Sequence, residues 1–425
     1  MDKDKILKLL KQEMAPALGV TEPAAIALAA ARAAQEIKGE IKKIELTLDP
    51  GLYKNAYSCG IPNTKEKGIE IAALLGLIKG DPDLGLKVLQ NITDSDVKKA
   101  KELRSKDIVK INIKEGYKDI YVSFKVSTDN SSSLVIIKNQ HDDIQYVETD
   151  GDVLLDQEKE SGNKEDSKNP FINFNMEEVL NLLNELKFDE IKFTLDAVEM
   201  NKKLAQKGKK GPGLGVGAGL THLVAEQAIA DDIVNYAQRL TAFAVDARMG
   251  GVPQPAMSFC GSGDHGIIAT LPLTAVTERK RIPKEKLAKS IILSYIITYY
   301  IKSKTGKLSA YCGCAVAAGT GACAGITYLL GGNKEQIIGA INNMAGNIAG
   351  MICDGGNDGC ALKASTATSA ALQSALLATE NHYLNSNNGI VGANLEETLD
   401  NMGKIAVPGM EETNDVIIDI LKDRD

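Results

Sequence analysis

The sequence contains no tryptophan, only 4% aromatic residues and four histidines. A core that lacks large rings and is built from Ala, Gly, Ile and Leu favours closely packed helices over a β-sandwich. Long hydrophobic runs are also missing: the longest, Ile291–Ile301, falls well short of the roughly 20 residues of a membrane-spanning helix. The chain opens MDKDKILKLLKQE, without the pattern of a signal peptide. We therefore expect a cytoplasmic protein with no membrane partner.

An excess of positive charge is absent as well. Lys and Arg total 49 against 56 Asp and Glu, a net charge of −7, which is the wrong sign for binding phosphate backbones. Nucleic acid and anionic membranes are therefore excluded as expected partners. With 44% hydrophobic and 25% charged residues over 425 positions, the composition is that of a globular protein and excludes fibrous or disordered classes.

The element pattern predicts an α+β N-terminal domain followed by an all-α, Gly/Ala-rich C-terminal domain. We place the α+β domain at residues 1–150, a polar loop or linker at 151–174 and the all-α domain at 175–425. Short β-branched strands, expected to be antiparallel, lie at 44–48, 108–113, 120–126, 133–138 and 144–148. Helices are expected at 22–37, with Thr21 as N-cap, and at 68–78, 94–102, 176–186, 191–206, 220–247, 284–303, 308–330, 334–351 and 361–380.

Seven cysteines, an odd number without an export signal, favour reduced thiols or metal thiolates over disulfides. Cys312, Cys314, Cys353 and Cys360 lie at expected helix ends and in a Gly/Asp/Asn loop, which suits zinc or an iron–sulfur cluster. Their spacing alone does not identify the metal. Cys323, within an Ala/Gly helix, is expected to be a buried core residue.

Three further segments have both a structural and a functional interpretation. The glycine tract Gly208–Gly219 favours a loop between helices over a phosphate site, because no strand precedes it. In the segment DARMGG, Asp246 and Arg248 indicate either a buried ion pair or an arginine that binds a substrate carboxylate. In Ser258–Pro272, the side chains of Ser262, Asp264 and His265 either face a ligand at a helix N-terminus or are structural. Of the other histidines, His141 and His382 are expected to face water, and His222 is given no role.

Several segments, spread along the whole chain, match a known pattern in combination: PALGVTEPAAIALAAA (16–31), LYKNAYSCGIP (52–62), DARMGG (246–251), GSGDHGI (261–267), KLSAYC (307–312) and MICDGGNDGCALK (351–363). Together they resemble the L-cysteine desulfidase family, which is related to the alpha chain of iron–sulfur L-serine dehydratases. The resemblance implies a [4Fe–4S] cluster on Cys312, Cys353 and Cys360, with an open iron site that acts as a Lewis acid. It also implies β-elimination from a small L-amino acid without pyridoxal phosphate.

The chain departs from this pattern at two places. Val20 replaces the family's cysteine in Gly-Cys-Thr-Glu-Pro, and Asp264-His265 replace Asn-Gln in Gly-Ser-Gly-Asn-Gln-Gly. We hypothesise that His265, with a near-neutral pKa and oriented by Asp264, takes an acid–base role. The expected substrate-binding residues are Thr21, Glu22, Lys54, Asn55, Arg248 and Ser262.

The leading functional prediction is a lyase that converts L-cysteine or L-serine to pyruvate, ammonia and sulfide or water. A cluster-dependent dehydratase or isomerase of another small hydroxy or amino acid is one alternative. A non-catalytic iron–sulfur or zinc-binding protein is another, for which Val20 would mark lost catalysis. The Ala/Gly-rich helices would suit a homodimer interface.

Overall fold

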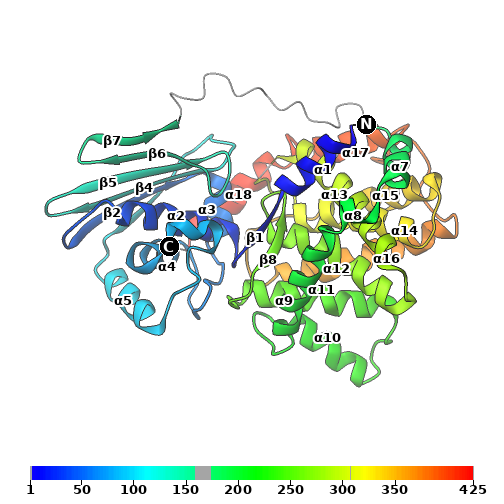
Figure 1. The fold of residues 1–425 in the computed structure, drawn as a ribbon, viewed down its shortest axis with the longest axis horizontal. Coiled ribbons are helices and arrows are strands. Elements are labelled where there is room, and N and C mark those ends of the chain that lie inside the picture. The colour runs from blue at the N-terminus through cyan, green and yellow to red at the C-terminus, as the bar shows by residue number, and fades with distance from the viewer. Residues whose placement is uncertain (1, 158–173, 307, 425) are drawn as a thin grey trace.

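The computed structural model describes residues 2–157, 174–306 and 308–424, which form a sheet-containing lobe beside a helical lobe (Figure 1). The sheet has six strands in the order β3-β2-β4-β5-β6-β7. Strand β3 pairs parallel with β2, and all other neighbours are antiparallel. The strands are β2 (Ile41–Leu48), β3 (Val109–Ile113), β4 (Tyr121–Thr128), β5 (Ser132–Lys138), β6 (Ile144–Thr149) and β7 (Asp152–Asp156).

Helices cover the inner face of this sheet, because apolar and polar residues alternate along its strands and the apolar ones share that face. In β4 the apolar residues Val122, Phe124 and Val126 are fully buried, while their neighbours are partly exposed. The Ala-rich helix α2 packs on β4 and β5 and also against α4, whose Gly76 lies directly on the backbone of Ala27. The helices of this lobe are α2 (Thr21–Ala34), α3 (Pro50–Ala56), α4 (Ile69–Lys79), η1 (Pro82–Lys87) and α5 (Asp94–Arg104).

The five predicted strands are all present, but three details differ from the prediction. Residues 152–156, expected in the polar loop, form β7, because Val153 and Leu155 extend the ladder with β6. Residues 158–173 of that loop lie outside the described residues. Strand β3 is parallel to β2 because α3, α4 and α5 carry the chain back to the same end of the sheet. Thr21 is the first residue of α2, and Val20 occupies the N-cap position.

The helical lobe includes strand β8 (Ala256–Phe259), which pairs with a strand from the N-terminus of the chain. Two long predicted helices are divided. The segment 220–247 becomes α10 and α11, since the Asp232 side chain accepts a hydrogen bond from Asn235 N and starts a new helix. The segment 308–330 becomes a π-helical turn followed by α14. The helices are α7 (Met176–Glu185), α8 (Phe188–Ile191), α9 (Thr194–Gly208), α10 (Val216–Ala225), α11 (Ile233–Met249), α12 (Gly263–Lys280), α13 (Lys284–Thr305), η2 (Gly313–Ala318), α14 (Gly319–Leu329), α15 (Lys334–Ile348), α16 (Cys360–Thr379) and α17 (Leu395–Ala406).

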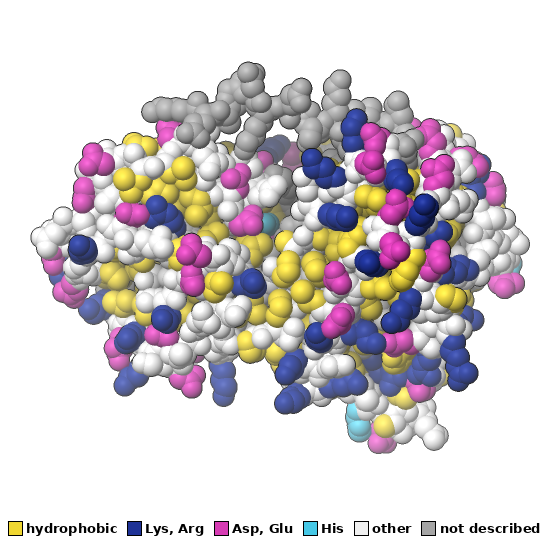
Figure 2. Space-filling view, in the orientation of Figure 1, with side chains coloured by type: hydrophobic (Ala, Val, Ile, Leu, Met, Phe, Trp, Pro, Cys, Tyr) yellow, Lys and Arg dark blue, Asp and Glu magenta, His cyan; other side chains and the backbone are white. Residues whose placement is uncertain are grey.

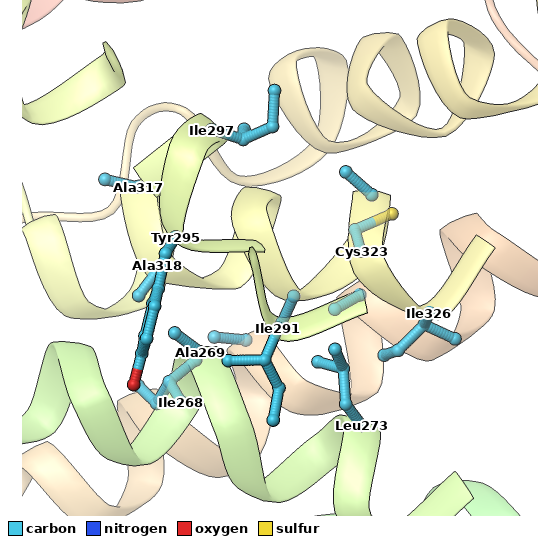
Figure 3. Packing of buried hydrophobic residues seen from close by; sticks show 14 of the residues in the cluster. Ile268, Ala269, Leu273, Ile291, Tyr295, Ile297, Ala317, Ala318, Cys323 and Ile326 are labelled. Carbon is cyan, nitrogen blue, oxygen red and sulfur yellow. The ribbon is translucent and has the colours of Figure 1, made fainter. Parts of the chain in front are cut away.

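Small side chains let these helices pack closely, as the composition predicted. Tyr295 of α13 lies beside Ile268 and Ala269 of α12 and the small Ala318 (Figure 3). Its ring stacks on Phe259 with the ring centroids 4.1 Å apart. Across the described ranges, no helix combines the length and the apolar character needed to cross a bilayer.

The N-terminal helix packs into the helical lobe, and the C-terminal helix packs into the sheet lobe. Helix α1 (Lys3–Gln12) belongs to the helical core, and β1 (Met14–Ala17) pairs antiparallel with β8. The last helix, α18 (Glu411–Lys422), packs against α3 and joins the core of the sheet lobe (Figure 1). The hydrophobic cores therefore do not follow a single boundary near residue 150. These crossings bring the starts of α2 and α12 and the end of α3 together.

Candidate active site

The three cysteines expected to hold a cluster come from separate segments that the fold brings together. Tyr311 and Ile352 form an antiparallel bridge, flanked by the hydrogen bonds Cys312 N to Met351 O (3.0 Å) and Cys353 N to Ala310 O (2.6 Å). This pairing places Cys312 and Cys353 on adjacent extended segments. Cys360 is the first residue of α16, and all three thiols are close enough to influence one another's pKa.

The surroundings of these thiols favour negative charge at one of them. The Cys314 thiol hydrogen-bonds Cys312 and, although burial opposes it, lowers the Cys312 pKa to about 7. The backbone N–H of Ala315 at the start of η2 acts in the same direction. Burial instead raises the pKa of Cys353 and of Cys360. Sequence reasoning had left the role of Cys314 undefined, and in the structure it is a thiol donor to Cys312.

Positively charged side chains lie around the thiols. Lys302 is partly buried and interacts electrostatically with Cys312, Cys314 and Cys353. Lys363, on the first turn of α16, interacts with Cys312 and Cys360. Lys54 interacts with Cys353. Positive charges beside the thiols would offset the free-energy cost of burying thiolate charge away from water.

A buried polar cluster adjoins the cysteines. Asn55 Nδ2 donates to Glu22 Oε1 at 2.8 Å, and Asn55 Oδ1 lies 3.9 Å from Cys353 Sγ. Thr21 Oγ1 lies 2.9 Å from Glu22 Oε2 and 3.0 Å from the carbonyl oxygen of Gly261, and it can donate to either. Burial would raise the pKa of Glu22, but attraction to His141 and Arg248 and the bonds from Asn55 and Thr21 lower it overall. Glu22 is therefore a carboxylate held close to the thiols.

Arg248 forms a buried ion pair, one of the two interpretations of its motif. Its Nη1 lies 2.9 Å from Asp264 Oδ1, and the two side chains are only 3% and 5% exposed. Its Nε donates to the carbonyl of Gly19 at 3.0 Å. A side chain at Gly263 would place Cβ 2.5 Å from Arg248 Nε, so only glycine fits there. The arginine thus fixes the loop before α2 to the start of α12.

The glycine tract is a loop between helices, as predicted. Helix α9 ends at Gly208 and α10 begins at Val216. The backbone N–H groups of Gly215 and Gly217 donate to the two carboxylate oxygens of Asp246, at 3.1 and 2.8 Å. Asp246 therefore supplies the negative charge at this helix start.

His265 lies against the cysteine segment, but not in the state that the sequence predicted. Its Nδ1 is 3.0 Å from the carbonyl of Phe259, which can only accept, so the proton resides on Nδ1. Its Nε2 faces Gly313, where an added Cβ would lie only 2.6 Å away. Burial, with the nearby charge of Lys302, lowers the pKa of His265 to about 3, so the expected near-neutral value is wrong. The expected orientation by Asp264 is replaced as well, since Asp264 pairs with Arg248.

The remaining predicted residues have defined places. Ser262 occupies the N-cap position of α12, with Oγ 3.7 Å from Cys314 Sγ. Lys54 is 1% exposed and donates to Ser309 O (3.0 Å) and Asn414 Oδ1 (2.9 Å), which ties α3 to the segment before Cys312 and to α18.

Val20 forms part of the wall of the site. A Cβ at Gly356 in the cysteine loop would lie 3.4 Å from a Val20 methyl and 2.4 Å from Cys59 Sγ. Cys59 is fully buried and donates to the carbonyls of Asn55 (2.6 Å) and Gly356 (3.2 Å). The chain therefore has an aliphatic group beside the cysteine loop at the position where the resembled family has a thiol.

Sequence reasoning missed His141. It lies in the turn between β5 and β6 among polar residues, and we expected it to face water. In the structure it is only 6% exposed, with Nε2 4.0 Å from Glu22 Oε1. No local signal could have found it, because its burial comes from α2 and from Gly261, which are distant in sequence.

Two surface hollows of about 600 and 430 Å³ are lined by other residues, the first by α1 and Glu190 and the second around Pro212 and Pro253. Within residues 2–157, 174–306 and 308–424, no three His, Cys, Asp or Glu side chains are placed to share one metal ion.

Comparison with known proteins identifies the family. The family model described as serine dehydratase alpha chain matches residues 83–419. The UPF0597 protein of Clostridium botulinum (strain Hall) is 47% identical over 427 residues, covering 99% of each chain. The UPF0597 protein of Clostridioides difficile is 40% identical over 98% of this chain and 99% of its own. That of Caldanaerobacter subterraneus is 40% identical over 99% of each. On the extent of these matches, the chain belongs to the serine dehydratase alpha chain family.

Proposed function

We propose that this protein is an iron–sulfur-dependent lyase that removes the β-substituent of a small L-amino acid, L-cysteine or L-serine. The products would be pyruvate, ammonia and sulfide from cysteine, with one water consumed, or pyruvate and ammonia from serine with no net water. The observation that carries this proposal is the gathering of Cys312 with Cys353 and Cys360 of the segment 351–363, beside the Glu22–Asn55 cluster.

The donor set fits a cluster better than a single ion. A mononuclear ion requires all its ligands within about 2.3 Å of one point, and the described residues do not offer such a group. A cubane cluster binds each thiolate on a different iron, so its ligands stand farther apart. The lysines around the thiols, Lys302, Lys363 and Lys54, suit the negative charge of three thiolates. Cys312, Cys353 and Cys360 would hold the cluster, which would supply a Lewis acid for the substrate carboxylate and the leaving group.

The side chains around the thiols would bind and orient the substrate. The Glu22 carboxylate is suited to bind the substrate α-ammonium, because Asn55 and Thr21 fix both of its oxygens. Asn55 lies between this carboxylate and Cys353, so it would position the ammonium relative to the metal side. Arg248 and Lys54 would act indirectly, because their charged groups are already engaged by protein partners.

His265 is the group best placed to move a proton. With its proton on Nδ1 bound to the Phe259 carbonyl, Nε2 has a lone pair directed toward Gly313, between Cys312 and Cys314. A pKa of about 3 leaves Nε2 unprotonated at physiological pH but weakly basic, so proton transfer by His265 would require the negative charge of the nearby thiolates to raise this pKa. Removal of the α-proton together with loss of the β-substituent yields an enamine, which hydrolyses to pyruvate and ammonia.

The first test is the iron and acid-labile sulfide content of protein purified without oxygen. We expect about four of each per chain in the wild type and their loss in Cys353→Ala. Cys323→Ala is the matched control, because Cys323 is a buried cysteine of α14 that bonds only to core groups. Turnover of L-cysteine and L-serine is then measured on the same samples.

The outcomes separate the alternatives. Stoichiometric zinc without sulfide, or protein without metal, would refute the lyase proposal. A cluster with turnover of a different hydroxy or amino acid would point to another dehydratase or isomerase. A cluster without any turnover would favour a binding protein, in keeping with the aliphatic Val20 in the site wall.

A further inference from the structure

His141 is a residue at the tip of a hairpin that does not face solvent. In the turn between β5 and β6, Gln140 and Asp142 are exposed, whereas His141 between them is buried. The turn is fixed by its own backbone hydrogen bonds, such as Lys138 N to Asp143 O at 3.1 Å. A buried imidazole between two solvent-exposed neighbours indicates that the ring makes specific contacts inside the protein.

That environment is the inner end of the candidate site. Nε2 lies 4.0 Å from Glu22 Oε1, with the two side chains 7% and 8% exposed. On its other side the ring borders Gly261, where an added Cβ would be 3.6 Å from Cε1 and from Nδ1. The carbonyl of the same Gly261 is in reach of the Thr21 hydroxyl. One imidazole from the sheet lobe thus touches both α2 and the loop that begins α12.

Several charged groups lie near His141. Glu22 faces it from α2, and Asp142 and Asp143 belong to its own turn. Beyond Glu22, Arg248 and Asp264 form their own ion pair, which contributes little net charge. Among these groups, Glu22 places a carboxylate oxygen 4.0 Å from Nε2, near enough to attract an ionised His141.

We propose that His141 is a positioning residue for Glu22: the imidazole holds this carboxylate ionised and directed toward Asn55 and the cysteines. This role rests on the proposed function in one respect, namely that the substrate ammonium is what Glu22 binds. His141 is also the described residue through which the sheet itself contacts Glu22, because the hydrogen bonds of Glu22 come from Thr21 of α2 and Asn55 of α3. In this proposal the sheet contributes to substrate binding through His141, at the tip of the β5–β6 hairpin.

The pairing can be measured by NMR on the full-length holoprotein labelled at histidine Cε1. With only four histidines, the His141 signal is assigned by its loss in His141→Gln. In Glu22→Gln, the pH midpoint of the His141 signal should fall by at least about one unit, because the imidazolium loses the carboxylate that lies 4.0 Å from its Nε2. The signal of the exposed His382 should not move and serves as the internal control. An unchanged His141 midpoint in Glu22→Gln would overturn the proposal.

Kinetics test the consequence for substrate. In His141→Gln we expect KM for the amino acid to rise about tenfold with a smaller change in kcat, and the acid limb of kcat/KM to move to higher pH. The direction follows because Glu22 loses the cation that lowers its pKa. His382→Gln is the matched control and should match the wild type. A purely structural role would lower stability without moving the acid limb, and that result would count against the proposal.

The two proposals fail separately. If no amino acid is turned over by iron-loaded protein, the proposed function fails, whereas the NMR shift still decides whether His141 and Glu22 are paired. If His141→Gln does not fold, the His141 signal is assigned as the one that remains when His222, His265 and His382 are replaced in turn, and the Glu22→Gln measurement still decides the pairing.

Discussion

The buried pair of Arg248 and Asp264 offers a direct test of how the site is assembled. Arg248→Met removes the partner of a carboxylate that is 5% exposed and lies near a second anion, Glu22. Leaving such a charge unpaired costs about 3–5 kcal/mol of unfolding free energy. The converse variant, Asp264→Leu, should cost less, since Arg248 retains its bond to the Gly19 carbonyl and its attraction to Glu22.

A double-mutant cycle isolates the interaction. Arg248→Met/Asp264→Leu removes both charges, so it should be more stable than the sum of the single changes predicts, by about 2 kcal/mol or more. Stability is followed by far-UV circular dichroism in urea, because the chain has no tryptophan to report by fluorescence. The matched control is Lys304 with Asp400, which has the same 2.9 Å separation but is 38% exposed on each side. That pair should couple by less than about 1 kcal/mol. Coupling in the buried pair below about 0.5 kcal/mol would refute the reasoning.

Two further predictions concern single residues. Burial raises the pKa of Asp49, which accepts hydrogen bonds from Leu52 N and Tyr121 N, from its ordinary value of 3.8 to about 7, so folded Asp49 binds more protons than unfolded Asp49 between these pH values. Its contribution to stability should therefore fall as pH rises from 4 toward 7, so the urea midpoint of Asp49→Asn should rise relative to that of the wild type over this range; a constant difference between the two proteins would contradict the assignment. His265→Gln should lower kcat at least about a hundredfold while the iron content is retained, and intact turnover would exclude His265 as the base.

Features of the fold that depend on residues close in sequence could be predicted, whereas features that depend on residues far apart in sequence could not. The predicted strands and helices follow from local patterns, such as the alternation in β4 and the Ala-rich run in α2, whereas α3, with its Asp49 cap and Pro50, was not predicted. The division of the segment 220–247 was missed because Asp232, a capping residue, was not weighed against the apolar pattern on either side. The parallel pairing of β3 was missed because strand direction depends on the intervening helices.

The site shows the same limit more sharply. Motif matches placed Glu22, Asn55 and the cysteines in one region, and the structure does bring them together. The partners of Asp264 and the pKa of His265 could not be derived, because both depend on burial among residues far apart in sequence. His141 is the clearest case, since nothing within its own turn distinguishes it from a solvent-exposed histidine.

Four of the polar contacts around the thiols join the two lobes. Arg248 holds the Gly19 carbonyl, Thr21 reaches the Gly261 carbonyl, and Lys54 bonds to the carbonyl of Ser309. Gly356 N donates to Asn55 O at 3.1 Å in the same way. Groups that would face substrate are thus presented by the sheet lobe to cysteines held by the helical lobe. The relative placement of the lobes must therefore be fixed to within hydrogen-bond distances for Glu22 and the thiols to act on one small molecule. The crossing of α1 and β1 to one core and of α18 to the other provides that constraint, since neither lobe can move away without breaking a hydrophobic contact of the other.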